Sequence, residues 1–289
     1  MSILTRRDFA KLAGAAGTTL AAGRLSADTT LTASQVVERV RANVGIPWNS
    51  RTFRDTFKVG NPEIAVRGIA STFMSTLDVL QRAHSMGLNM VVTHEPTFWS
   101  DGDEQDSLLN DPLYKFKVDF VTKNDMVVWR FHDHWHAHKP DGIMTGWDKA
   151  LMWDKYLPNP AERLYVIPPT TLESVVNHVR DSLKTGSIRV IGDPALTVSR
   201  IGRGAHNLSG NMAMMPRVDA LLVSEAREWD SIEYVRDTVL SGQKKGMILI
   251  SHEAGEEAGM DECAKWLKGF ITEIPVQFID SHDSFWRPA

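Results

Sequence analysis

Cysteine is almost absent from this chain: Cys263 is the only one among 289 residues. No disulfide can therefore form within the chain, even in an oxidising compartment. Its stability has to come from the apolar core or from bound metal.

The chain also lacks an excess of positive charge. It carries 32 Lys and Arg against 36 Asp and Glu, a formal net charge of −4, and the basic residues are scattered. Nucleic-acid affinity depends on basic groups that displace counterions from phosphates, so a nucleic-acid partner is not expected. The sequence also has no P-loop and no dinucleotide-binding fingerprint.

Long hydrophobic runs are missing as well. The Gly- and Ala-rich run 12–22 is too short to span a bilayer, so no stable membrane anchor is expected. The run follows the Arg6-Arg7 pair, the pattern of a twin-arginine export signal, and cleavage is predicted after Ala27. An amphipathic N-terminal helix is the alternative, but the run has no polar face and its glycines weaken a helix. The sequence therefore predicts a periplasmic or secreted protein.

Beyond residue 27, short apolar runs alternate with amphipathic stretches. This alternation predicts an α/β fold with two lobes, each a mainly parallel sheet covered by helices, and a metal site in the cleft between them. Pro158 and Pro160 mark the lobe boundary. The predicted parts are a signal peptide at 1–27 and lobes at 28–157 and 158–289, and the C-terminal segment can pack back on the first lobe. Among the predicted helices are 146–156 and 260–270.

Polar side chains follow three of the predicted strands, at the carboxyl ends where open α/β sheets hold their sites. The strand 88–93 ends in His94 and Glu95, and Pro96 then disrupts the strand, so both side chains can turn toward one site. The alternative is a capping histidine beside a solvated glutamate.

The second strand, 126–131, runs into four of the ten histidines. Imidazoles suit a borderline divalent ion. In an extended chain, His132 and His136 would lie about 13 Å apart and could not share one ion. Either the chain curls after Phe131, or only one or two of these residues bind metal and the rest position substrate. An exposed polar loop is the alternative.

The third strand, 247–251, ends in His252, and Glu256 follows four residues later. In a helical turn these two side chains face the same side and can reach one metal ion. The alternative is that acids here only complement a helix N-terminus. Each of the three patterns is modest alone, but together they predict side chains that converge on one site.

Two further residues are weaker candidates. Glu225 follows a predicted strand, and His206 lies in a Gly-containing segment. A helix cap and a turn, respectively, are the alternatives to a role in the site.

These segments resemble the Nif-three-like family (NGG-interacting factor three), whose members are also known as GTP cyclohydrolase I type 2 homologues. The resemblance covers nearly the whole chain after the signal. Residues 91–98 are similar to the family's Ser/Thr-His-His-Pro segment, and 127–136 to a strand that ends His-Thr-Asn-Leu-Asp. The resemblance implies a two-metal centre and often a hexameric ring.

By this matching, His94, His252 and Glu256 coincide with family ligands, and His132 matches the first residue of the family's second segment. Two positions depart from the family pattern. Glu95 stands where the family has a second histidine, and His136 stands where it has an aspartate. A histidine and an acid are therefore exchanged between two positions, which can preserve the balance of donors while changing the preferred metal.

We therefore predict a centre with two divalent ions, of Zn, Mn, Fe, Co or Ni. Its predicted ligands are His94, Glu95, His132, His136, His252 and Glu256. Glu95, Asp133 and His134 are the candidates for proton transfer.

The predicted function is hydrolysis of a small molecule, such as an amide, ester, cyclic amidine or phosphoester. A non-catalytic metal-binding or scaffold protein is the alternative, and a cytosolic adaptor is a third possibility if the export signal is spurious. A homo-oligomer, with a hexamer as the family form, is expected from the resemblance alone.

Overall fold

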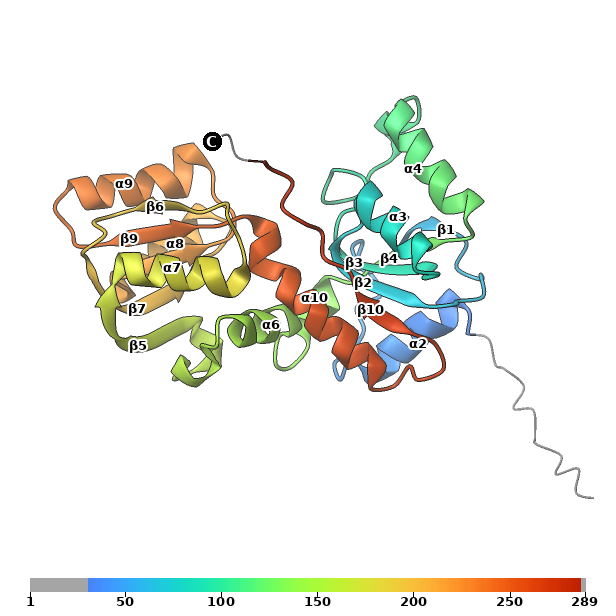
Figure 1. Ribbon diagram of the computed structural model, residues 1–289, viewed down its shortest axis with the longest axis horizontal. Helices are drawn as coiled ribbons and strands as arrows, with labels where there is room; N and C mark the ends of the chain where they lie inside the picture. The colour runs from blue at the N-terminus through green and yellow to red at the C-terminus, as the bar shows by residue number, and fades with distance from the viewer. Residues whose placement is uncertain (1–30, 287–289) are drawn as a thin grey trace, which may run out of the picture. The chain divides into compact units, whose positions relative to one another are not determined.

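Two five-stranded sheets organise residues 31–286, which are the residues that the computed structural model describes (Figure 1). They belong to one compact unit. The predicted α/β class is confirmed. The predicted signal peptide, residues 1–27, lies outside the described residues.

The first sheet has the strand order β1-β4-β3-β2-β10. Its strands are β1 (Phe57–Gly60), β2 (Ile69–Met74), β3 (Met90–Glu95), β4 (Val127–Arg130) and β10 (Val276–Phe278). All neighbours pair in parallel except β1, which runs antiparallel to β4. The last strand of the chain thus completes the sheet that the first strands begin.

Helices cover both faces of this sheet (Figure 1). They are α2 (Ala33–Asn43), α3 (Leu77–Ser85), α4 (Pro112–Lys123) and α10 (His252–Lys268). Along β3, Met90 and Val92 pack with α2 and α10, whereas Val91 packs with α3 and α4. Alternate residues of a strand point to opposite faces, so a strand buried on both sides is apolar throughout.

The second sheet has the order β5-β7-β8-β9-β6. Its strands are β5 (Leu164–Thr171), β6 (Arg189–Ile191), β7 (Thr197–Arg203), β8 (Ala220–Val223) and β9 (Gly246–Leu249). The three central strands are parallel, and both edge strands are antiparallel. The expectation of mainly parallel pairing thus fits the first sheet better than the second.

Helices α7 (Leu172–Leu183) and α9 (Glu233–Leu240) pack in two separate clusters with this sheet. The remaining α-helices are α5 (Asp133–Ala137), α6 (Gly142–Ala150) and α8 (Leu208–Met214). Four short segments of the described chain are 3-10 helices: η1 (Asp106–Leu108), η2 (Asp154–Tyr156), η3 (Pro160–Glu162) and η4 (Met215–Arg217). One further segment, η5 (Glu228–Ile232), is a π-helix. Among the described residues, none of the helices has the length and apolar character needed to cross a bilayer.

Two helices differ from their predicted bounds, and in both a side-chain cap sets the observed start. The predicted helix 146–156 is instead α6, because the Asp141 side chain caps its start and Met152, just after its end, takes a left-handed backbone (φ 55°). The predicted helix 260–270 begins earlier, at His252, because the Ser251 side chain accepts a hydrogen bond from the Ala254 N–H. The earlier start places His252 and Glu256 within one regular helix.

Helices α6 and α10 cross at glycines. A Cβ on Gly146 would lie 2.2 Å from the Ala258 carbonyl oxygen, and one on Gly259 would lie 2.5 Å from the Ile143 Cα. No side chain fits at either position, since the obstructing atoms are backbone. The contact fixes α10 against α6 and thereby fixes the side chains that project from the start of α10.

Candidate metal centre

The first donor, His94, lies near the carboxyl end of β3 and is fully buried. Its Nδ1 lies 3.2 Å from the Phe131 carbonyl oxygen, to which an Nδ1–H donates. This hydrogen bond selects the tautomer in which Nε2 carries a lone pair. The Nε2 points to the Glu256 carboxylate, 3.2 Å away.

The second group of donors forms because the chain curls after Phe131. Helix α5 begins at Asp133, so His132 and His136 lie one turn apart, with ring centroids separated by 4.9 Å. Their rings lie 4.5 and 5.0 Å from that of His94. Of the two alternatives left open by the sequence, the structure adopts the curled one.

A buried carboxylate, Asp55, fixes this curl. Its oxygens accept hydrogen bonds from the backbone N–H groups of His132, Asp133 and His134, at 2.6, 2.9 and 2.9 Å. These N–H groups open α5 and have no partner within the helix. The Asp55 carboxylate thus satisfies them and sets the direction in which the His132 and His136 side chains leave the helix.

The third group comes from the first turn of α10. Glu256 is 4% exposed, and its Oε2 lies 3.1 Å from the Nε2 of His252. The His94 Nε2, His252 Nε2 and Glu256 Oε2 atoms are buried, and none of the three makes a hydrogen bond within the described part of the chain. A metal–ligand bond of about 2.0–2.2 Å places two ligands of one ion about 3.0–3.4 Å apart. The His94–Glu256 and His252–Glu256 separations both fall within this range, as expected of side chains that bind metal.

The fourth donor, Glu95, lies between the two sides of the cluster. Its Oε1 is 3.7 Å from the His132 Nε2 and 3.8 Å from the His252 Nε2. Its Oε2 lies 3.0 Å from the guanidinium of Arg130, a fully buried side chain. Arg130 therefore holds one oxygen of Glu95 and leaves the other facing the imidazoles.

Three of the histidines have a carboxylate beside Nδ1, the ring nitrogen that faces away from the centre. The Nδ1 atoms of His132, His136 and His252 lie 3.0, 3.2 and 3.2 Å from carboxylate oxygens. The carboxylates belong to Asp133, Asp141 and Glu225, respectively. An acid behind a ligating histidine fixes the ring and its tautomer and increases its basicity. Each of these rings therefore presents Nε2 toward the centre.

The pKa values reflect this crowding of acids and imidazoles. Burial and the neighbouring imidazoles of His94 and His136 lower the pKa of His132 to about 3. Burial opposes protonation of His252 too, but Glu225 and Glu256 outweigh it and raise the pKa to about 10. Burial raises the pKa of Glu95.

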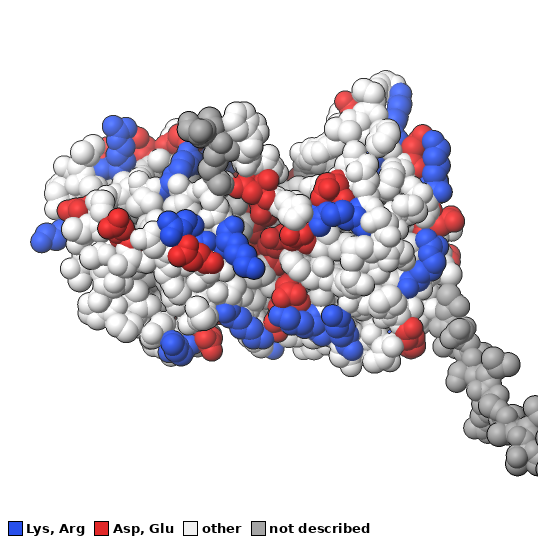
Figure 2. Space-filling model, in the orientation of Figure 1, with Lys and Arg blue, Asp and Glu red and all other residues white. Residues whose placement is uncertain are grey.

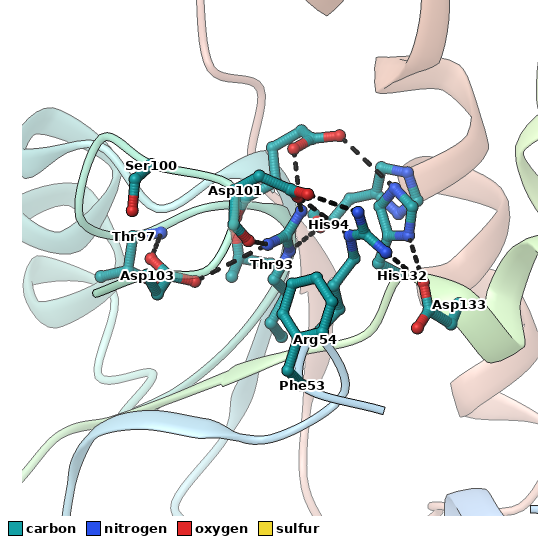
Figure 3. Close-up of polar contacts among 12 residues, drawn as sticks. Phe53, Arg54, Thr93, His94, Thr97, Ser100, Asp101, Asp103, His132 and Asp133 are labelled. Carbon is teal, nitrogen blue, oxygen red and sulfur yellow. Dashed lines mark hydrogen bonds and ion pairs between the residues drawn. The ribbon is translucent and has the colours of Figure 1, made fainter. Parts of the chain in front are cut away.

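A network of ion pairs continues outward from Glu95 through Arg130. Arg130 also contacts Asp101 at 3.2 Å, and Arg54 pairs with both Asp101 and Asp133. Asp133 in turn bonds the His132 ring. Figure 3 shows Asp101, Arg54, His132 and Asp133 linked by dashed contacts beside His94, so the loop that carries Asp101 and the first turn of α5 belong to the same network.

His134 has a different position from the other histidines of its segment. Its Nδ1 bonds Asp55, its Nε2 accepts the Asn49 N–H at 2.8 Å, and Trp48 stacks on the ring with centroids 3.6 Å apart. Both ring nitrogens are engaged, so this geometry gives the predicted proton-transfer role of His134 no support. Asp133, the other candidate in this segment, bonds Thr52 as well as His132.

His206 joins the cluster although it is not among the predicted ligands. It follows β7, and its Nε2 lies 4.0 Å from the Glu256 Oε1 and 2.8 Å from the Ser224 Oγ. Glu225 lies beside it and beside His252. The sequence places His206 after a strand, but it offers no partner at helical spacing that would single out this residue.

The side chains form three overlapping groups that could hold metal, with ligand atoms within 4.8 Å of one another in each group. The groups are His94, His132 and His136; His94, Glu95 and Glu256; and His206, His252 and Glu256. All six predicted ligands therefore lie in one continuous cluster, to which His206 is added.

Two pockets meet at this cluster. One has a volume of about 800 Å³ and the other about 510 Å³, and Glu95, His132, His206 and His252 line both. In the larger pocket, Trp99 and Leu113 contribute apolar surface beside Lys117. Burial lowers the pKa of Lys117 to about 8. Figure 2 shows acidic side chains gathered at the centre of the face in view, with basic side chains around them.

Comparisons with known proteins identify the family. Residues 27–284 match the family model described as Duf34/NIF3 (NGG1p interacting factor 3). The chain belongs to this family. The resemblance inferred from the sequence motifs is confirmed.

Two relatives from clostridia carry the name GTP cyclohydrolase 1 type 2 homolog. The one from Clostridium perfringens is 23% identical over 153 residues, which cover 50% of this chain and 57% of the relative. The one from Clostridium acetobutylicum is 27% identical over 146 residues, which cover 47% and 53%. The chain thus spans little more than half the length of these relatives.

Solved structures share the fold. A Bacillus cereus protein related to NIF3 superposes with a TM-score of 0.70 at 12% identity, covering 90% of this chain and 99% of that chain. Staphylococcus aureus protein SA1388 gives a TM-score of 0.64 at 14% identity, covering 90% and 100%. At these identities the likeness establishes the NIF3 fold alone.

Isosteric changes on neighbouring glutamates test the centre. We expect Glu256→Gln to lose most of the metal bound by the purified protein, because the amide removes the charge that faces His94 and His252. Glu257→Gln is the matched control, since Glu257 faces the backbone N–H of Ser281 instead. Metal per chain is measured by mass spectrometry, with His252→Ala and His178→Ala as a second pair. Equal metal in all four variants would refute the assignment.

A second test concerns the curl of the chain at α5. Asp55→Ala should reduce metal affinity about 10- to 100-fold, as expected for loss of a residue that positions ligands. It should also lower the free energy of unfolding by about 1–3 kcal/mol, because buried N–H groups lose their acceptor. Metal titrations and urea unfolding measure the two effects. Unchanged metal affinity in a folded variant would contradict the positioning role.

Proposed function

We propose that this NIF3-family protein is a hydrolase that depends on two divalent metal ions and acts on a small molecule. The observation that carries the proposal is the set of buried ligand atoms of His94, His252 and Glu256, which face one another without hydrogen bonds. Buried polar atoms without hydrogen bonds are costly, and cations bound by these side chains would satisfy all three. Pockets beside these atoms offer room for a substrate.

The candidate ligands divide into two sets on either side of the Glu95 carboxylate. His94, His132 and His136 would hold one ion, and His252 and Glu256 the other, with Glu95 between them. His206 is available to the second set from the pocket side. The donors are imidazoles and carboxylates without a thiolate, which suits Zn, Mn, Fe, Co or Ni. When bound, such ions lower the pKa of water and polarise a substrate oxygen.

Proton transfer in this proposal falls to Glu95 or Asp133. Glu95 lines both pockets, and Asp133 lines the smaller one. His134 is assigned a positioning role, since its ring is held between Asp55 and Asn49. The substrate class includes amides, esters, cyclic amidines and phosphoesters. GTP is not part of the proposal, because the sequence has no P-loop and the predicted compartment holds little nucleotide.

Turnover of model substrates tests the hydrolase. We expect the metal-loaded protein to cleave at least one of p-nitrophenyl acetate, bis(p-nitrophenyl) phosphate and an anilide. Activity should disappear on chelation, return with added metal, and survive in His178→Ala but not in Glu256→Gln. Two bound ions without turnover on any such substrate would instead favour a metal-binding or scaffold protein.

Export and self-association complete the proposal. We infer export through the Arg6-Arg7 signal, with the mature protein acting in the periplasm and forming a homo-oligomer. Cell fractions of a C-terminally tagged chain should contain a shortened periplasmic form, which Arg6→Lys/Arg7→Lys would abolish. A full-length protein confined to the cytoplasm would refute export. Light scattering of the purified protein would decide the oligomeric state.

A further inference from the structure

A buried arginine, Arg203, lies in the wall of the smaller pocket, at the carboxyl end of β7. It is 7% exposed, and its guanidinium carbon lies 4.4 Å from the ring centroid of Trp147. One of its nitrogens contacts the Met144 sulfur. The aromatic ring and the thioether hold the guanidinium in place without neutralising it.

Among the residues that the structure describes, this guanidinium has no ion-pair partner. Across residues 31–286, every ion pair within 4.0 Å involves other side chains, and the only hydrogen bond donated by the Arg203 side chain goes to Met144. The acids Asp141, Asp148 and Glu256 act on it only from greater distance. An unpaired buried charge is costly, so a fixed guanidinium of this kind favours an anionic partner.

A second arginine, Arg163, is hydrogen-bonded to Arg203 through the backbone. The Arg203 backbone N–H donates to the Arg163 carbonyl oxygen at 2.9 Å, which places the last residue of β7 beside the residue that precedes its paired strand β5. Arg163 is exposed and also lines the smaller pocket. In the described part of the chain, its side chain takes part in no hydrogen bond or ion pair. Two guanidinium groups are therefore available to one ligand.

We propose that Arg203 and Arg163 form a subsite for an oxyanion of the substrate, a phosphate or a carboxylate, beside the metal centre. A guanidinium presents N–H groups in a planar fork that matches two oxygens of such an anion. The subsite rests on the proposed function, because its role is to orient a substrate at the ions.

Side chains that line both pockets indicate how a bound substrate would be oriented. His132, His206 and His252 line both pockets, so a molecule anchored at Arg203 passes the donor cluster before it reaches Trp99 in the larger pocket. The anionic end of the substrate therefore lies on the Arg203 side, and its apolar body lies against Trp99. The bond to be cleaved lies between these two parts.

Binding of inorganic phosphate by the full chain tests the subsite. Calorimetric titrations at constant ionic strength are made on metal-loaded and chelator-treated protein, because phosphate can also bind the ions. Arg203→Met should weaken phosphate binding at least about tenfold in both forms, as expected for loss of a charged hydrogen-bond donor. Arg163→Met should weaken it less, and Arg203→Lys should recover part of the loss.

Arg67→Met is the matched control, because Arg67 is exposed and precedes β2 at the end of the strand away from the cluster. It removes one positive charge and should leave phosphate binding unchanged. If Arg203→Met does not fold, Arg203→Lys and Arg163→Met still decide the matter. Wild-type affinity in all of these variants, or phosphate binding only in the metal-loaded form and regardless of Arg203, would overturn the subsite.

Two readouts separate this inference from the function on which it rests. Metal content should be the same in the arginine variants as in the wild type, since neither arginine belongs to a donor group. A wild-type protein that binds no divalent metal even after metal is added, yet binds phosphate through Arg203, would refute the hydrolase proposal and leave the subsite supported. Propionate as a second probe identifies the anion: binding of phosphate alone indicates a phosphoryl group, and binding of propionate alone a carboxylate. Binding of neither overturns the subsite.

Discussion

The site depends on one buried carboxylate, that of Glu256. It is enclosed by His94 and His252 at 3.1–3.2 Å and stands within reach of His206. Because these histidines come from β3, the start of α10 and the segment after β7, the carboxylate marks the point where distant parts of the chain meet. Buried acids and imidazoles without hydrogen bonds are an unfavourable arrangement for a folded protein by itself, and cation binding removes that cost.

The rest of the fold holds this point in place. Glycines at the α6–α10 crossing let the helices approach until backbone touches backbone, which fixes the position of Glu256. Asp55 fixes α5 and with it His132 and His136. Arg130 fixes Glu95. Each donor is therefore oriented by a buried polar group or a close packing contact, as a preorganised metal site requires.

The charge distribution around the donors suggests how a substrate is oriented. On one side, Trp99 and Leu113 present apolar surface. On the other, Arg203 presents a fixed and unpaired guanidinium held by Trp147. The centre lies between the apolar side chains of Trp99 and Leu113 and the guanidinium of Arg203, which suits a molecule with one apolar and one anionic end better than a uniformly polar one.

The sequence by itself determined the α/β class, the family and the three strand ends that carry the donors. These follow from local rules: apolar runs form buried strands, and polar residues mark the points where the strands end. It also placed His252 and Glu256 one turn apart, because helical spacing is a local property. Only the tertiary structure decided that the chain curls at His132, since the acceptor that stabilises the curl, Asp55, is distant in sequence. The same holds for His134, which packs between Trp48 and Asp55, and for His206 and Arg203. Their roles arise from neighbours brought together by packing, and packing contacts leave no periodic signal in the sequence.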